Sequence, residues 1–202
     1  MSKMSASGRL AAFENVKRSV NVDTLLPSLV FAGTWAKFFF CESDRIFGAH
    51  FVGAVTELMR LEGGTVACLA NLDLTPVSEL AGFAAIYVDR ATTTEQYRDA
   101  LQAGGPQSGW LYRMDRYACA SDAGSWCIYC EKSNDVAVIA LRDNSDADWS
   151  RGPLTQLWAK PIEELVDGGS SPLFPFDMLV PDWRKGLIDT YGNGPSHDGY
   201  DG

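Results

Sequence analysis

Two runs rich in β-branched and aromatic residues, separated by a short polar break, most constrain how this chain can fold. They lie in Trp126–Arg142, WCIYCEKSNDVAVIALR, on either side of Lys132–Asp135. This pattern predicts a β-hairpin. A third run begins at Arg116 and is joined to the hairpin by the turn-forming residues Ser121–Ser125. The sequence therefore predicts a three-stranded antiparallel meander over Arg116–Arg142.

Helical and extended patterns interleave through the rest of the chain. Helical spacing or capping predicts helices over Ala6–Val20, Phe47–Leu61, Thr92–Gln102, Pro161–Val166 and Asp182–Tyr191. Apolar runs predict extended segments over Ser28–Cys41, which also fits a helix, Thr65–Leu72 and Gly82–Asp89. Without a strict βαβ rhythm, these elements predict an α+β fold, with a mostly antiparallel sheet, the meander in its C-terminal half and several packed helices. We expect one globular domain over residues 1–192 and a disordered polar tail over residues 193–202.

Charge and cysteine content limit the possible partners and location. The chain has 202 residues and a net charge of −9, from 26 acidic and 17 basic side chains. Such a charge repels nucleic acid and anionic membranes and speeds association with a basic partner, although it also fits a role in solubility alone. We see neither a signal-like segment nor a charge-free apolar run of about 18 residues. With five irregularly spaced cysteines, the chain is predicted to be cytoplasmic, with reduced thiols.

The cysteine spacing favours packing over chemistry. Cys127 and Cys130 have the C-x-x-C spacing of many redox and zinc sites, but they fall within a predicted strand. Because strand side chains alternate between two faces, residues three apart point in opposite directions. We therefore expect no shared metal or disulfide there. A symmetric Ser121–Ser125 turn would place Cys119 opposite Cys127, either as two packed thiols or as a redox pair.

Histidines are scarce, which removes many catalytic sites. The chain has His50 and His197, and His197 falls in the predicted tail. No nucleophile motif accompanies His50, which we interpret as a helix-start residue on a packed face. Zinc-type ligand spacing is missing, and a calcium loop starting at Asp146 would need glycine where Arg151 stands. We therefore predict no catalytic residue, no metal and no cofactor.

Tryptophans beside loops and helix ends, together with an acidic loop, indicate a protein-binding surface. Tryptophan is enriched at the energetically important positions of protein interfaces, although some of these residues must belong to the core. The acidic loop would attract a basic partner. The predicted binding residues are Trp110, Asp143, Asp146, Asp148, Trp149, Trp158 and Trp183.

The hairpin also resembles a known pattern. Trp126–Glu131 (WCIYCE) and Asp135–Leu141 (DVAVIAL) resemble the aromatic-x-Ile-Tyr-x-Glu and Asp-x-Ala-Val-Ile pattern of small bacterial immunity proteins. Those proteins are encoded beside the toxins of type VI secretion, contact-dependent and other polymorphic systems, and they bind and block their cognate toxin. The likeness covers roughly residues 116–142. Immunity families share few fixed functional residues, so no site residue carries over.

The resemblance implies a protein that occludes a toxin's active site by stoichiometric binding, without being an enzyme. Its expected partner is a cognate toxin with a basic surface, and neither nucleic acid nor a membrane is expected as a partner. The alternative is a small enzyme or metabolite-binding protein with an unrecognised site. A deep polar pocket containing His50 or converging carboxylates would favour that alternative.

Overall fold

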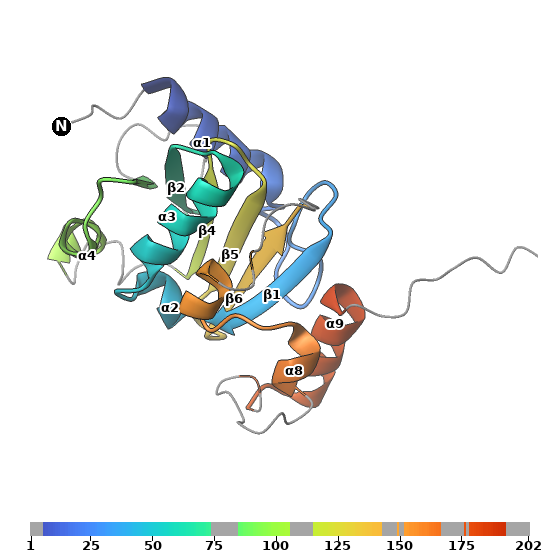
Figure 1. The fold of residues 1–202 in the computed structure, drawn as a ribbon. Helices are drawn as coiled ribbons and strands as arrows, with labels where there is room; N and C mark the ends of the chain where they lie inside the picture. Colours follow the sequence, from blue (N-terminus) through green and yellow to red (C-terminus); the bar gives the residue numbers. More distant parts are fainter. Residues whose placement is uncertain are drawn as a thin grey trace, which may run out of the picture.

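A six-stranded sheet organises the chain. The computed structural model describes residues 6–73, 85–105, 115–142, 149, 152–166, 176 and 178–192. Within them, the strands follow the spatial order β1-β6-β5-β4-β2-β3, and every neighbouring pair is antiparallel. The strands are β1 Lys37–Glu42, β2 Val66–Asn71, β3 Ala85–Asp89, β4 Arg116–Ser121, β5 Trp126–Glu131 and β6 Val136–Leu141. Together with helices on both faces, this sheet confirms the predicted α+β fold (Figure 1).

The predicted meander forms the centre of this sheet. Strands β4, β5 and β6 pair in sequence order, and Ile128 of β5 lies opposite Ile139 of β6. Every residue of β5 and β6 is buried. Both strands are apolar along most of their length because both faces of the sheet are covered. The meander is confirmed, and Ile128, Val138 and Ile139 all lie in the core.

The pairing of the strands also determines how the cysteines are arranged. Cys127 and Cys130 pack in different buried clusters, on opposite faces of the sheet, as predicted. The expected facing of Cys119 and Cys127 is wrong: Cys119 lies opposite Ile128, and Cys127 lies opposite Ala120. The register of β4 and β5 differs by one residue from the register that a symmetric turn would give. A shift of one residue moves a side chain to the other face, so Cys119 and Cys127 are separated by the sheet.

Helices cover both faces of the sheet. The described helices are α1 Ala6–Ser19, α2 Asp44–Phe47, α3 Phe51–Glu62, α4 Thr94–Gln102, α7 Pro153–Gln156, α8 Ile162–Val166 and α9 Pro181–Tyr191. Side chains of α2, α3, α4 and α7 enter one buried cluster, which we call the α3-side core. Side chains of α1, α8 and α9, with the loop over residues 20–31, enter the other, the α1-side core. Figure 1 shows α3 lying across one face of the sheet, with α8 and α9 near β1.

The C-terminal segment passes around β1, which is an edge strand. Leu157, just after α7, packs in the α3-side core, whereas Ile162 of α8 packs in the α1-side core. Between them, Lys160 exchanges two backbone hydrogen bonds with Phe40 of β1, at 2.7 and 3.0 Å. The segment thus changes faces at the sheet edge and pairs with part of an edge that would otherwise expose free backbone groups.

Most predicted helices and strands are present, with shifted ends. Thr93 caps α4 in a capping box. The predicted helix Phe47–Leu61 is interrupted by Gly48–His50, which separates α2 from α3. His50 is the N-cap residue of α3 and is exposed, not packed as expected. The last residues of the predicted extended segment Ser28–Cys41 lie in β1.

Two further expectations concern the tail and membranes. The predicted disordered tail, residues 193–202, lies outside the described residues. Among the residues that are described, no helix is long and apolar enough to span a membrane. The longest of them, α1, has 14 residues, whereas a span needs about 20.

The buried meander predicts a large energetic effect of truncating Ile128, which is 1% exposed. We expect Ile128→Ala to lower the free energy of unfolding by about 2–5 kcal/mol, through lost burial and the cavity left behind. Urea unfolding followed by circular dichroism measures this change. The control is Val180→Ala, because Val180 is 65% exposed and a surface change of this kind alters stability by about 0.5 kcal/mol or less. Equal effects of the two substitutions would contradict the placement of Ile128.

Candidate functional site

The predicted binding tryptophans have different surroundings in the structure. Outside the described residues lie Trp110, Asp143, Asp146 and Asp148. Trp149 is 7% exposed and belongs to the α3-side core. Trp183 is half-buried against the α1-side core, and its indole N–H donates to the carbonyl of Leu26 at 3.2 Å. Trp158 is 57% exposed, so the three predicted binding tryptophans that the structure describes do not form one exposed patch.

Trp158 occupies an unusual backbone position at the end of α7. Its N–H donates to the carbonyl of Thr155 at 3.1 Å, and the N–H of Ala159 donates to the carbonyl of Leu154 at 2.9 Å. These two hydrogen bonds define a Schellman motif, whose C′ residue must adopt the left-handed conformation. Trp158 has a φ of 57° and is that residue. The tight turn lets the chain leave α7 and reach the edge of β1.

A tryptophan at this position is conformationally unfavourable. Glycine is the usual C′ residue because it has no Cβ, and a bulky L-residue pays about 1 kcal/mol or more in the left-handed region. Burial does not compensate for this cost, because more than half of the Trp158 side chain is exposed. Strained residues of this kind are concentrated at functional sites. This strain makes Trp158 a candidate functional residue.

Arg45 holds the indole of Trp158 in place. The guanidinium carbon of Arg45 lies 4.4 Å from the ring centroid, which is a cation–π contact. Glu42, at the end of β1, pairs with Arg45 at 3.1 Å. Tryptophan and arginine are the two residue types most enriched at the energetic centres of protein interfaces, along with tyrosine. The three side chains form a preorganised aromatic and charged group, which we call the Trp158 group.

A shallow depression lies beside this group. Its cavity volume is about 10 Å³, which is about the space that one water molecule needs. Its apolar lining comes from both sides of the β1 edge and consists of Cys41, Leu157, Leu165 and Phe176, with the Trp158 group completing it. Sites for small molecules usually enclose about 300–1,000 Å³ and bury most of the ligand. The depression is therefore far smaller than a metabolite-binding site.

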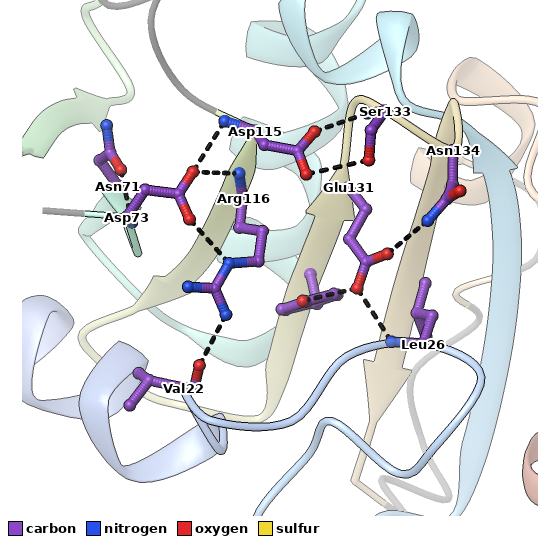
Figure 2. Close-up of polar contacts among 10 residues, drawn as sticks. Val22, Leu26, Asn71, Asp73, Asp115, Arg116, Glu131, Ser133 and Asn134 are labelled. Atoms are coloured by element: carbon purple, nitrogen blue, oxygen red, sulfur yellow. Dashed lines mark hydrogen bonds and ion pairs between the residues drawn. The ribbon is translucent and has the colours of Figure 1, made fainter.

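A polar network at the end of the sheet contains the carboxylates of Asp73, Asp115 and Glu131 (Figure 2). The Asp73 carboxylate accepts hydrogen bonds from the backbone N–H of Asp115 at 2.7 Å, and from the backbone N–H and Nε of Arg116 at 2.8 and 2.7 Å. Arg116 also donates from Nη1 to the carbonyl of Val22 at 2.6 Å. Burial opposes ionisation of Asp73, but these hydrogen bonds and the charge of Arg116 outweigh it and lower its pKa.

The second half of the network is built around Glu131, which is 3% exposed. Its Oε1 accepts from the backbone N–H of Leu26 at 2.9 Å and from the hydroxyl of Tyr129 at 2.8 Å. Its Oε2 accepts from the side-chain amide of Asn134 at 2.7 Å (Figure 2). Arg116 and Glu131 thus fasten the loop over residues 20–31 to the sheet. These hydrogen bonds give the network a structural role, and they occupy the groups that an acid–base site would need.

The other reactive side chains are also poorly placed for chemistry. All five thiols are buried, and burial raises the pKa of each of them. A thiol must ionise to attack a substrate or bind a metal, so burial makes these cysteines poorly suited to either role. Burial also raises the pKa of Glu62, whose carboxylate accepts from the indole N–H of Trp126 at 2.7 Å. No group of three or more His, Cys, Asp or Glu within the described ranges could hold a metal ion.

Comparison with known proteins adds no relative. No family model matches the chain, and neither the curated proteins nor the solved structures contain a significant match.

The sequence analysis includes Trp158 among the candidate binding residues but not the residues that surround it. Glu42 and Arg45 are three residues apart at the β1–α2 junction, whereas Leu165 and Phe176 follow more than 100 positions later. No local pattern places those residues beside Trp158, because the passage of the chain around β1 brings them together.

The hydrogen bonds to Asp73 predict a pH-dependent contribution to stability. We expect Asp73→Asn to lower the free energy of unfolding at pH 7 by about 1–3 kcal/mol, since charge-assisted hydrogen bonds to a partly buried carboxylate are lost. Because the folded-state pKa is lowered, this contribution is present above the unfolded pKa of about 3.9 and is lost as the pH falls through the folded pKa.

Urea unfolding of both proteins between pH 7 and pH 2 measures the difference. Asp99→Asn is the matched control, since Asp99 is exposed on α4. A difference between the Asp73 variant and the wild type that stays constant down to pH 2 would show that the carboxylate charge is not responsible.

The left-handed conformation of Trp158 predicts an inverted order of two substitutions. We expect Trp158→Gly to be more stable than Trp158→Ala by about 1 kcal/mol, because both lose the ring and glycine alone relieves the strain. The same pair of substitutions at Arg98, inside α4 and exposed, should show the ordinary order, with alanine more stable by about 0.5–1 kcal/mol. Urea unfolding of the four variants measures both differences in stability. An alanine variant at position 158 that equals or exceeds the glycine variant would refute the strained conformation.

Proposed function

We propose that this protein is an immunity-type binding protein, which neutralises a cognate bacterial toxin by covering that toxin's active site. The Trp158 group is proposed as the centre of the interface. The likeness of Trp126–Glu131 and Asp135–Leu141 to immunity proteins supports this function at the level of sequence.

The single observation that carries the proposal is the exposed indole of Trp158 in a left-handed conformation. Trp158 is 57% exposed and has a φ of 57°, in a position where glycine would be more stable. Arg45 stacks on the ring and limits its motion. A large, rigid ring that is ordered before binding loses little side-chain entropy on association, which favours a tight complex.

Charge supports a basic partner. The net charge of −9 attracts a cationic surface over a distance that screening limits to about 8 Å at physiological ionic strength. Such attraction mainly accelerates encounter, whereas packed aromatic contacts mainly set how long the complex lasts. The proposed mechanism is therefore electrostatic approach followed by burial of the Trp158 ring.

The test is co-expression with the product of the adjacent gene, followed by growth measurement and size-exclusion chromatography. A stoichiometric complex and protection of growth are the expected results. Failure to obtain either one contradicts the proposal. Turnover of a substrate by the purified protein, abolished by substituting His50 or one of the network carboxylates, would favour the enzyme interpretation instead.

The association and dissociation rates of the complex should distinguish the contribution of the ring contacts from that of the charge. We expect Trp158→Gly to speed dissociation at least tenfold, which corresponds to about 1.4 kcal/mol or more of lost binding free energy. Leu10→Ala is the control, because Leu10 is 62% exposed on α1, away from the β1 edge. Association of the wild type should slow markedly as salt rises from low to physiological concentration. Surface plasmon resonance measures both rates, and a Trp158→Gly complex as long-lived as the wild-type complex would remove this residue from the interface.

A further inference from the structure

We infer that two copies of this protein associate through strand β3, which pairs in antiparallel orientation with β3 of the second copy. The two six-stranded sheets then form one continuous sheet. This inference does not rest on the proposed toxin binding, because β3 lies at the edge of the sheet opposite to β1 and the Trp158 group.

The backbone groups of β3 alternate between β2 and the outer edge. The N–H of Asp89 donates to Oγ1 of Thr92 at 2.9 Å, and its carbonyl accepts from the N–H of Thr92 at 3.1 Å. Asp89 therefore turns its backbone groups away from β2. Because residues along an antiparallel strand alternate in this respect, Ala85 and Tyr87 also turn their N–H and C=O groups toward the outer edge.

The outer edge of β3 is open to a further strand. Among the described residues, no hydrogen bond reaches the backbone N–H and C=O groups of Ala85 and Tyr87. At the opposite edge, Lys160 pairs with part of β1. Over Ala85–Val88, β3 has no such cover in the described part of the chain, and it carries no charge, proline or bulge that would block pairing. An edge of this kind is a template for another chain.

One antiparallel register uses all four of these groups. When Ile86 lies opposite Ile86 of the second copy, Ala85 of each copy lies opposite Tyr87 of the other. Each of these two pairs exchanges two backbone hydrogen bonds. Thr92 already occupies the groups of Asp89, so the paired segment ends there in both copies. The arrangement is two-fold symmetric and closed, so it removes the open edge without building a fibre.

The side chains of β3 fit a copy of themselves in this register. Ala85 and Tyr87 are half-buried on the side of the α1-side core, and each large ring lies opposite a small methyl group. On the other face, the two Ile86 side chains meet at a non-hydrogen-bonded pair, where cross-strand side chains are closest. Arg9 lies 5.2 Å over the Tyr87 ring and is exposed, so its charge stays in water.

The expected dimer is weak and is strengthened by salt. An interface built on so short a paired segment belongs to the small, transient class, for which we expect a Kd on the order of 10–100 µM. Each copy has a net charge of −9, so the two copies repel each other at long range. Screening by salt reduces this repulsion, and we expect the dimer to tighten at least about threefold from low to physiological salt.

Sedimentation velocity of the full-length protein at increasing concentration measures the equilibrium. Ala85→Pro removes one outward N–H from each copy, and proline is tolerated at the first residue of an edge strand. Ala85→Glu adds a charge next to the paired backbone. We expect each substitution to weaken the dimer at least about tenfold. Ala91→Glu is the matched control, since Ala91 is exposed just after β3, and it should weaken the dimer less than about twofold.

Amide hydrogen exchange of the wild-type protein locates the contact without any substitution. The N–H groups of Ala85 and Tyr87 should exchange rapidly in dilute solution and become protected as the concentration rises. Three results would overturn the inference: a protein that is monomeric at about 1 mM, a dimer that both Ala85 variants leave unchanged, or exchange of these two amides that does not depend on concentration. These measurements do not involve the toxin, so their failure is distinct from failure of the proposed function.

Discussion

The structure depends on covering a sheet that is buried on both faces. Strands β5 and β6 are buried throughout, so helices are needed on each side of the sheet. A segment that contributes to both cores must pass around the edge strand β1. The segment from α7 to α8 does so, and two backbone hydrogen bonds between Phe40 and Lys160 fix its path. A tight reversal at the end of α7 is a consequence of this path. The Schellman motif provides that reversal.

The same constraint explains why the candidate site is where it is. The reversal places Trp158 at the corner between the two cores, beside the β1–α2 junction that carries Glu42 and Arg45. Backbone geometry favours glycine at this corner, yet the chain has tryptophan there. Stability that is given up at one exposed residue is commonly associated with function. The carboxylate network around Glu131 has the opposite character, because its hydrogen bonds stabilise the fold and leave its groups occupied.

Local patterns were sufficient to predict the elements but not their mutual placement. The runs in Trp126–Arg142 identified the meander because strand propensity and short polar turns act locally. The prediction that Cys119 faces Cys127 was wrong because it depends on the register of the two strands. A one-residue difference in the turn changes that register. Burial of Trp149 and exposure of Trp158 could not be distinguished, since both residues have polar neighbours in sequence and their environments are set by distant segments. Nothing in the sequence indicated a left-handed conformation at Trp158, because tryptophan is not a residue that favours it.

The central claim is that tryptophan at position 158 serves binding at the expense of folding. Saturation of this position, scored separately for protease resistance and for protection of growth against the cognate toxin, tests it most directly. The account predicts that the two rankings differ: glycine, and next asparagine, should give the most resistant proteins, whereas tryptophan should protect best. If tryptophan ranks first for protease resistance as well, or if protection follows resistance across all substitutions, the claim is contradicted.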